Sequence, residues 1–104
     1  MPDNSSGPLQ EGIFTGSGMG FVGEVELEVH FLRESPDSHP LIGQIRTLQS
    51  DEVREYWNRV IKELKPQVID RQSTDIDTLT GATESSRAFL EAVENAMDKA
   101  YETK

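Results

Sequence analysis

Apolar and polar residues alternate strictly along Glu24–Leu32, EVELEVHFL. One face of this segment carries four apolar side chains, and the other carries three glutamates and His30: Val25, Leu27, Val29 and Phe31 against Glu24, Glu26, Glu28 and His30. A period of two is typical of a strand with one buried face, which occurs mostly in antiparallel sheets. We therefore predict a half-buried antiparallel strand here.

Weaker strand patterns lie on both sides of this segment. Gly12–Thr15 is a short candidate strand, and the GSGMG that follows predicts a hairpin turn into the alternating strand. The polar run RESPDSHP predicts a loop after it, and Leu41–Leu48 then reads as a third strand.

The apolar period changes to that of helices after residue 50. Ser50 is a candidate helix cap, and a stripe at helical spacing follows until Pro66, which we expect to end the helix: Val53, Tyr56, Trp57, Val60, Ile61 and Leu64. Gln67–Asp70 reads as a short extended segment, and residues 71–84 as a polar loop. A last helix over about Ser86–Tyr101 would bury a second stripe: Phe89, Leu90, Val93, Ala96, Met97 and Ala100.

The order of these elements predicts an α+β fold, a small antiparallel sheet packed by two main helices. A chain of 104 residues has room for one domain. The first ten residues are polar with two prolines, so we expect residues 1–10 to be a disordered lead-in and residues 11–104 to form the domain.

Composition excludes several classes of function. The net charge is −9, from 19 acidic and 10 basic residues, and no basic stripe is present, which disfavours binding to nucleic acid or to anionic membranes. No cysteine is present, so disulfides and thiolate chemistry are excluded. Neither a membrane-spanning segment nor a signal-like start is visible, and we expect no direct insertion into a membrane.

Gly18–Gly23, GMGFVG, matches the G-x-G-x-x-G pattern of dinucleotide-binding folds. That pattern requires a helix immediately afterwards, whereas here a strand follows. Two readings stay open: a hairpin turn with left-handed glycines, or glycines that let backbone approach a flat ligand.

The sequence gives little support for a metal-binding or catalytic site elsewhere. The three glutamates of the alternating strand indicate a solvated face more than a metal site, and we expect no metal. His30 and His39 have no partner at metal-ligand or triad spacing, and no G-x-S-x-G motif accompanies the serines.

Five hydroxyl residues crowd into Thr78–Ser86, within DTLTGATESSR. Threonine and serine are common caps at helix starts, so helix capping and turn formation would explain them. Alternatively, the free N–H groups and positive dipole end of the last helix could stabilise a phosphate placed near Thr83.

The same segment, with Asp77, Thr80, Gly81, Ala82, Thr83 and Ser85, resembles the D-x-x-[S/T]-G-A-T-x-[S/T]-S signature of the FMN-binding domain family. This family includes flavin subunits of sodium-pumping and related membrane NADH oxidoreductases, and domains of flavin-dependent reductases. Gly12–Val29 resembles the family's opening pattern and Phe89–Ala100 its closing helix, so most of residues 11–101 is covered.

The resemblance implies that FMN is the cofactor. It also implies that a separate Mg²⁺-dependent flavin transferase moves the FMN portion of FAD onto the threonine at Thr83, as a phosphoester. Asp77 would serve in recognition or positioning during transfer, and Gly81 and Ala82 would give a tight, accessible turn. Gly18, Gly20 and Gly23 would neighbour the flavin ring. The domain would then pass electrons to a redox partner or reductase domain.

The chain departs from the family at Gln49–Glu52, where larger relatives carry Glu-Thr-Pro-Gly, so no flavin contact from that loop can be transferred. The resemblance suggests an extracytoplasmic or membrane-associated location. Three alternatives stay open: non-covalent FMN binding, a domain cut from a larger reductase, and a flavin-free acidic interaction module.

Overall fold

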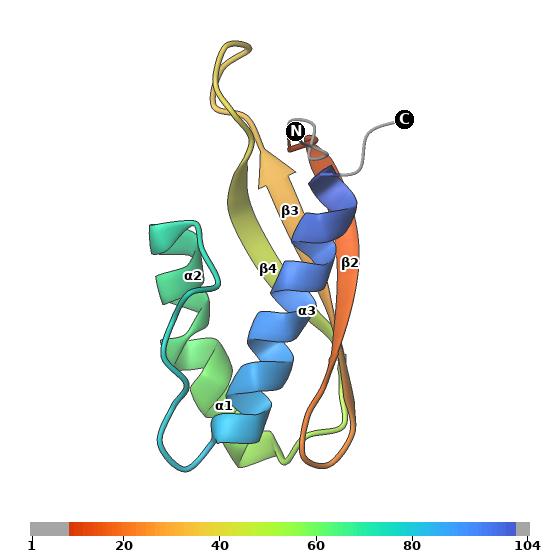
Figure 1. Cartoon of the computed structure of the whole chain (residues 1–104), viewed down its shortest axis with the longest axis vertical. Helices are drawn as coiled ribbons and strands as arrows, with labels where there is room; N and C mark the ends of the chain where they lie inside the picture. Colours follow the sequence, from red (N-terminus) through yellow and green to blue (C-terminus); the bar gives the residue numbers. More distant parts are fainter. Residues whose placement is uncertain (1–8, 102–104) are drawn as a thin grey trace.

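The computed structural model describes residues 9–101. Its sheet has three antiparallel strands in the order β2 (Gly12–Met19), β3 (Glu24–Leu32) and β4 (Leu41–Ser50), so that β3 is central (Figure 1). The predicted alternation along β3 is confirmed, because its four apolar side chains are fully buried while the intervening residues are partly or fully exposed.

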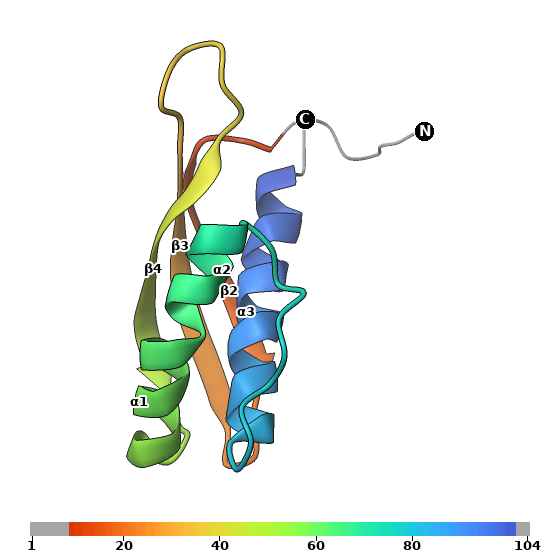
Figure 2. The same ribbon diagram turned by 90° about the vertical axis from the view of Figure 1, so that its left-hand side faces the viewer.

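Three helices cover the buried face of the sheet: α1 (Arg54–Glu63), α2 (Lys65–Arg71) and α3 (Thr83–Tyr101). The long α3 packs across β2 and β3, and α2 packs against β4 (Figure 2). The predicted α+β class, with a small antiparallel sheet under two main helices, is therefore confirmed.

The core lies between β3 and α3. Its largest fully buried side chains include Phe31, Leu27 and Phe89, and the Phe89 ring meets Trp57 of α1 edge to face, with centroids 6.0 Å apart. Beyond Phe14, the face of β2 toward α3 carries Gly16 and Gly18 instead of large side chains. A Cβ at Gly16 would lie 1.9 Å from the Ala92 carbonyl oxygen, so only glycine allows α3 this close.

Several predicted element boundaries are wrong. The first strand is longer than expected, and α3 begins at Thr83 instead of Ser86. Gln67–Asp70 belongs to α2 and is not extended. Pro66 does follow the end of α1, but it also occupies the first turn of α2, where a residue without an N–H donor is tolerated.

The start of α1 also differs from the prediction. Ser50 is the last residue of β4, and α1 begins at Arg54 with Val53 as its N-cap and no side-chain cap. Of the predicted apolar stripe, Trp57 is buried, whereas Val53 and Tyr56 are more than one third exposed.

The predicted lead-in lies mostly outside the described residues, which begin at Leu9. Its last two residues contact the domain: Leu9 packs against the core, and the Gln10 N–H donates to the Ala100 carbonyl at 2.8 Å.

Candidate functional site

Three segments that are far apart in sequence meet at one end of the molecule. They are the β2–β3 turn (residues 20–23), the first turn of α1 and the first turn of α3 (Figure 1). A hollow of about 260 Å³ lies between them, lined by Phe21 of the turn, Tyr56 of α1 and residues 81–85. The hydroxyl-rich segment thus forms one wall of a surface hollow whose other walls are aromatic.

A tight turn leads into α3. The Ala82 N–H donates to the Leu79 carbonyl at 3.0 Å, and Gly81 has a φ of +84°. A positive φ at the third position of a four-residue turn favours glycine strongly, which accounts for Gly81. The guanidinium of Arg59 donates to the Thr80 carbonyl at 3.2 Å and so ties this turn to α1.

Two of the five hydroxyls in this segment are buried and fully engaged. Ser86 Oγ donates to the Ala82 carbonyl at 2.7 Å and accepts the Leu79 N–H at 3.1 Å. Ser85 Oγ donates to Glu52 Oε1 at 2.6 Å. Buried polar groups are normally satisfied in this way, so these two serines hold the turn and the helix start together.

The remaining three hydroxyls, of Thr78, Thr80 and Thr83, are exposed and have no side-chain hydrogen bond to any residue within 9–101. Of these three, Thr83 lines the hollow. It is the first residue of α3, and the helix is preceded by Ala82, whose carbonyl accepts the Ser86 N–H at 2.9 Å. Thr83 therefore does not cap the helix, and capping does not explain its hydroxyl.

Glu52 is a site residue that the sequence pattern did not identify. Only 8% of it is exposed, and its carboxylate accepts three backbone N–H groups of the β2–β3 turn. Oε1 accepts from Phe21 at 3.1 Å, and Oε2 accepts from Val22 at 2.7 Å and Gly23 at 3.1 Å. Burial raises the pKa of Glu52, but the hydrogen bonds from Ser85 and from these amides outweigh it and hold the pKa below its usual value.

The glycines that the family resemblance singled out are packed against protein. A Cβ at Gly18 would lie 2.3 Å from the Ala88 carbonyl oxygen, and one at Gly20 would lie 2.4 Å from the Glu52 carboxylate. Gly23 lies similarly close to the Asp51 side chain. Of the two readings left open for these glycines, the hairpin turn is confirmed, but its left-handed backbone is wrong, since the positive-φ glycines within residues 9–101 are Gly12 and Gly81. A place beside the flavin ring stays a prediction for all three.

Asp77 lies in the loop between α2 and α3. Its side chain is exposed and has no partner among the described residues. It is not among the residues that line the hollow. The structure thus gives Asp77 no part in packing.

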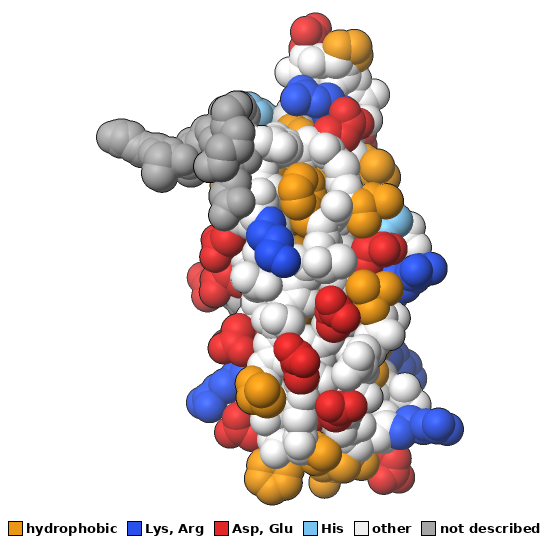
Figure 3. All heavy atoms as spheres, turned by 90° about the vertical axis from the view of Figure 1, so that its right-hand side faces the viewer, with side chains coloured by type: hydrophobic (Ala, Val, Ile, Leu, Met, Phe, Trp, Pro, Cys, Tyr) orange, Lys and Arg blue, Asp and Glu red, His pale blue; other side chains and the backbone are white. Residues whose placement is uncertain are grey.

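Large apolar side chains are exposed around the hollow. Phe21 is 80% exposed and Tyr56 44%, and Met19, Val22 and Val53 on the same segments are each more than 40% exposed. Hydrophobic side chains gather at this end of the molecule in the space-filling view (Figure 3). Exposed apolar clusters of this kind mark sites of contact with a ligand or partner.

The FMN-binding domain family matches residues 20–98, which include every wall of the hollow. The chain belongs to this family. It is 34% identical over 92 residues to an NADH:acrylate oxidoreductase of Vibrio harveyi, and 35% identical over 85 residues to a urocanate reductase of Eggerthella lenta. These matches cover 88% and 82% of this chain, but only 9% and 13% of the two relatives.

The FMN-binding domain has residues that fit its cofactor. Aromatic walls suit a flat ring system, and the first turn of a long helix suits a phosphate. Glu84 also lines the hollow, and its carboxylate lies 3.5 Å from the Arg87 guanidinium. Because typical ligand pockets measure roughly 300–1,000 Å³, this hollow would hold part of FMN and leave the rest exposed.

Among the helices within residues 9–101, none has an apolar stretch long enough to cross a bilayer. The same residues contain no group of three or more histidine, aspartate or glutamate side chains arranged to hold a metal ion.

Proposed function

We propose that this FMN-binding domain carries FMN as a phosphoester on Thr83 Oγ1 and serves as an electron-transfer module. The observation that carries the proposal is the state of the Thr83 hydroxyl. It is exposed, it has no hydrogen-bond partner among residues 9–101, and it stands at the start of α3 beside an aromatic hollow. Its neighbours Ser85 and Ser86 are buried and engaged, so a modifying enzyme would not reach them.

The attachment is a phosphoryl transfer from FAD. Thr83 Oγ1 attacks the phosphorus that carries the riboflavin part, the P–O–P anhydride bond breaks, and AMP leaves. The proton of the hydroxyl passes to a base of the transferase. A threonine hydroxyl is a weak nucleophile at neutral pH, and no base lies within hydrogen-bond distance of it among the described residues, so an external transferase must activate it.

The chain's own residues then hold the product. The free N–H groups and the dipole of the first turn of α3 stabilise the negative phosphoester at Thr83. Phe21 and Tyr56 offer apolar surface to the ring system. The bound flavin supplies the redox chemistry, while the domain supplies attachment and surroundings that set its potential.

We propose further that the redox partner is a reductase domain or subunit. The two relatives are by name an oxidoreductase and a reductase, and each is many times longer than the segment that this chain matches. The exposed apolar side chains around the hollow are well placed to contact such a partner. The substrate of that partner is a property of the partner and not of this domain.

The proposal is tested by co-expressing the chain with a flavin transferase and measuring its intact mass. We expect a mass increase of one FMN less one water, and yellow colour that survives acid denaturation. An unmodified mass with flavin released on denaturation would favour non-covalent binding instead.

Thr83 variants assign the site. Thr83→Ala should lose the covalent flavin completely, with little change in stability because its exposed hydroxyl makes no hydrogen bond to any described residue. Thr83→Ser should retain some modification, and Thr80→Ala should retain it fully. Covalent flavin on Thr83→Ala would contradict the assignment.

Asp77→Ala tests recognition by the transferase. Since the Asp77 side chain is exposed and has no hydrogen bond or ion pair to any described residue, we expect this variant to be as stable as the parent yet to accept flavin slowly. Unchanged loading together with lower stability would show that Asp77 is a structural turn residue.

A further inference from the structure

Glu52 connects the β2–β3 turn to the start of α3, the two parts of the site that lie farthest apart in the sequence. Its carboxylate accepts three N–H groups of the β2–β3 turn, and it accepts the hydroxyl of Ser85, which lies two residues after Thr83 on α3. One carboxylate thus connects the segment that carries Phe21 to the helix turn that carries Thr83.

This connection has a consequence for Phe21. The ring is 80% exposed, and nothing in the core holds it. Its backbone N–H is bonded to Glu52 Oε1, the same oxygen that accepts from Ser85. The position of the ring over the hollow therefore depends on the turn backbone, and the turn backbone depends on Glu52.

A further contact supports this arrangement. Gly20 N donates to Gly23 O at 2.9 Å, which closes the turn, and a Cβ at Gly20 would collide with the Glu52 carboxylate. The carboxylate consequently fills the space under the turn. Water could not replace it without breaking four hydrogen bonds at once.

We propose that Glu52 is a positioning residue: it fixes the β2–β3 turn against the start of α3, so that Phe21 forms a wall for the flavin ring beside Thr83. This inference rests on the proposed function for the presence of the flavin. It adds a specific role for an acidic residue that does not itself line the hollow but holds two residues that do, Phe21 and Ser85. Asp51 next to it is exposed and does not contact the turn's N–H groups, so it provides a matched control.

Glu52→Gln is the sharpest substitution, because it keeps the size of the side chain. A carboxamide has one acceptor oxygen, and its NH₂ group takes the place of the other carboxylate oxygen, where it faces a backbone N–H donor. If the remaining oxygen accepts from Val22 and Gly23, the Phe21 N–H is left without an acceptor. Asp51→Asn removes the same charge from the same loop while leaving all four hydrogen bonds intact.

The first measurement uses the flavin-free proteins. Amide hydrogen exchange in the β2–β3 turn should be faster by about ten- to a hundred-fold in Glu52→Gln at each N–H that faces the NH₂ group, since a lost acceptor leaves its donor unsatisfied. Exchange in β3 and α3 should change far less. Asp51→Asn should match the parent chain.

The second measurement uses chains loaded by the transferase, all checked by intact mass. Flavin fluorescence in Glu52→Gln should rise toward that of the same loaded chain in urea, because the aromatic wall no longer stacks on the ring. Phe21→Ala should show the same rise, and we expect it to fold like the parent because this side chain is exposed. Asp51→Asn should keep the fluorescence of the parent.

The outcomes separate the two proposals. A parent chain without added mass contradicts the covalent attachment, whatever Glu52 does. A loaded Glu52→Gln chain with parental fluorescence, or a Phe21→Ala chain with parental fluorescence, overturns the positioning role.

Discussion

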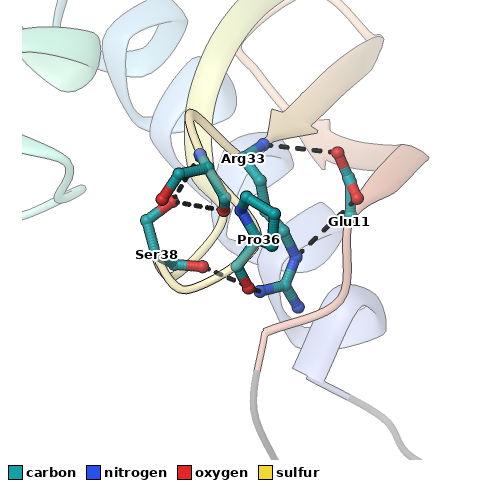
Figure 4. Close-up of polar contacts among 5 residues, drawn as sticks. Glu11, Arg33, Pro36 and Ser38 are labelled. Atoms are coloured by element: carbon teal, nitrogen blue, oxygen red, sulfur yellow. Dashed lines mark hydrogen bonds and ion pairs between the residues drawn. The ribbon is translucent and has the colours of Figure 1, made fainter.

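The two connections at the ends of β3 are built in opposite ways. At the site end, the β2–β3 turn is held by the buried carboxylate of Glu52 through three backbone N–H groups. At the other end, the β3–β4 loop is held by Arg33, whose guanidinium donates to the Ser38 carbonyl at 2.7 Å and lies 3.7 Å from a Glu11 carboxylate oxygen (Figure 4). The side chains of Arg33 and Glu11 are 37% and 51% exposed.

This difference shows where the fold requires a fixed geometry. Exposed ion pairs contribute little, because water replaces them readily when they open. A buried carboxylate with several donors tolerates only one arrangement of its neighbours, because each misplaced donor is left unsatisfied. The buried charge lies at the end that carries Thr83, whereas the hydrogen bonds and the ion pair of Arg33 and Ser38 at the far end lie at the surface.

Removing the buried carboxylate should have the largest effect. Glu52→Ala leaves three turn amides and the Ser85 hydroxyl without their acceptor, so we expect a loss of about 2–4 kcal/mol in the free energy of unfolding. Urea denaturation followed by circular dichroism measures it. Glu55→Ala, an exposed acid on α1, should change stability by less than about 0.5 kcal/mol. Equal losses of stability in Glu52→Ala and Glu55→Ala would contradict the special role of the buried carboxylate.

Replacing a glycine by alanine should also cost more stability at the site end than at the far end. Gly18→Ala places a methyl group 2.3 Å from the Ala88 backbone oxygen. We expect it to cost about 1–3 kcal/mol, since α3 must move away from β2. Gly43→Ala meets only the end of the exposed Leu32 side chain, which can turn aside, so its effect should stay below about 1 kcal/mol. Thermal unfolding of both variants compares them.

Acid should weaken the site end selectively. The pKa of Glu52 is lowered in the folded chain from the usual value of a glutamate, so its ionised form stabilises the fold above that usual value, and the contribution is lost as pH falls through the folded pKa. The stability difference between the parent and Glu52→Gln should therefore be largest near neutral pH and shrink in acid. Ser38→Ala, which alters no titratable group, should show a difference independent of pH. A constant difference for Glu52→Gln would contradict the assigned ionisation.

The smallest effect is expected at the far end. Arg33→Ala removes exposed contacts, so we expect a change below about 1 kcal/mol in the free energy of unfolding. Loading of flavin and flavin fluorescence should equal those of the parent chain. A clear loss of loading would show that the β3–β4 loop takes part in recognition by the transferase.

The sequence predicted the parts of the fold that depend on periodicity. The alternation along β3 and the stripe along α3 both identified the buried face, because burial of one face imposes its period on the pattern. The segment after Pro66 could not be assigned in this way. Proline ends one helix and also suits the first turn of the next, and a helix of seven residues is too short to show a period.

The site was predictable only in part. The motif around Thr83 indicated FMN, but the sequence could not separate the engaged hydroxyls of Ser85 and Ser86 from the free one of Thr83. Glu52 was missed since an acid just before a helix is most simply explained by the helix dipole. Its partners are backbone N–H groups some thirty positions earlier, which carry no side-chain signal.

One measurement tests the central claim most directly, which is that the free hydroxyl beside the hollow is the one that carries FMN. Trypsin should release residues 72–87 of the loaded chain as one peptide, which contains every hydroxyl of the motif. Tandem mass spectrometry of this peptide locates the added phosphoester residue by residue. We predict that it lies on Thr83 alone. Modification on Ser85 or Ser86, which are buried, or on Thr80, which lies outside the hollow, would contradict the account.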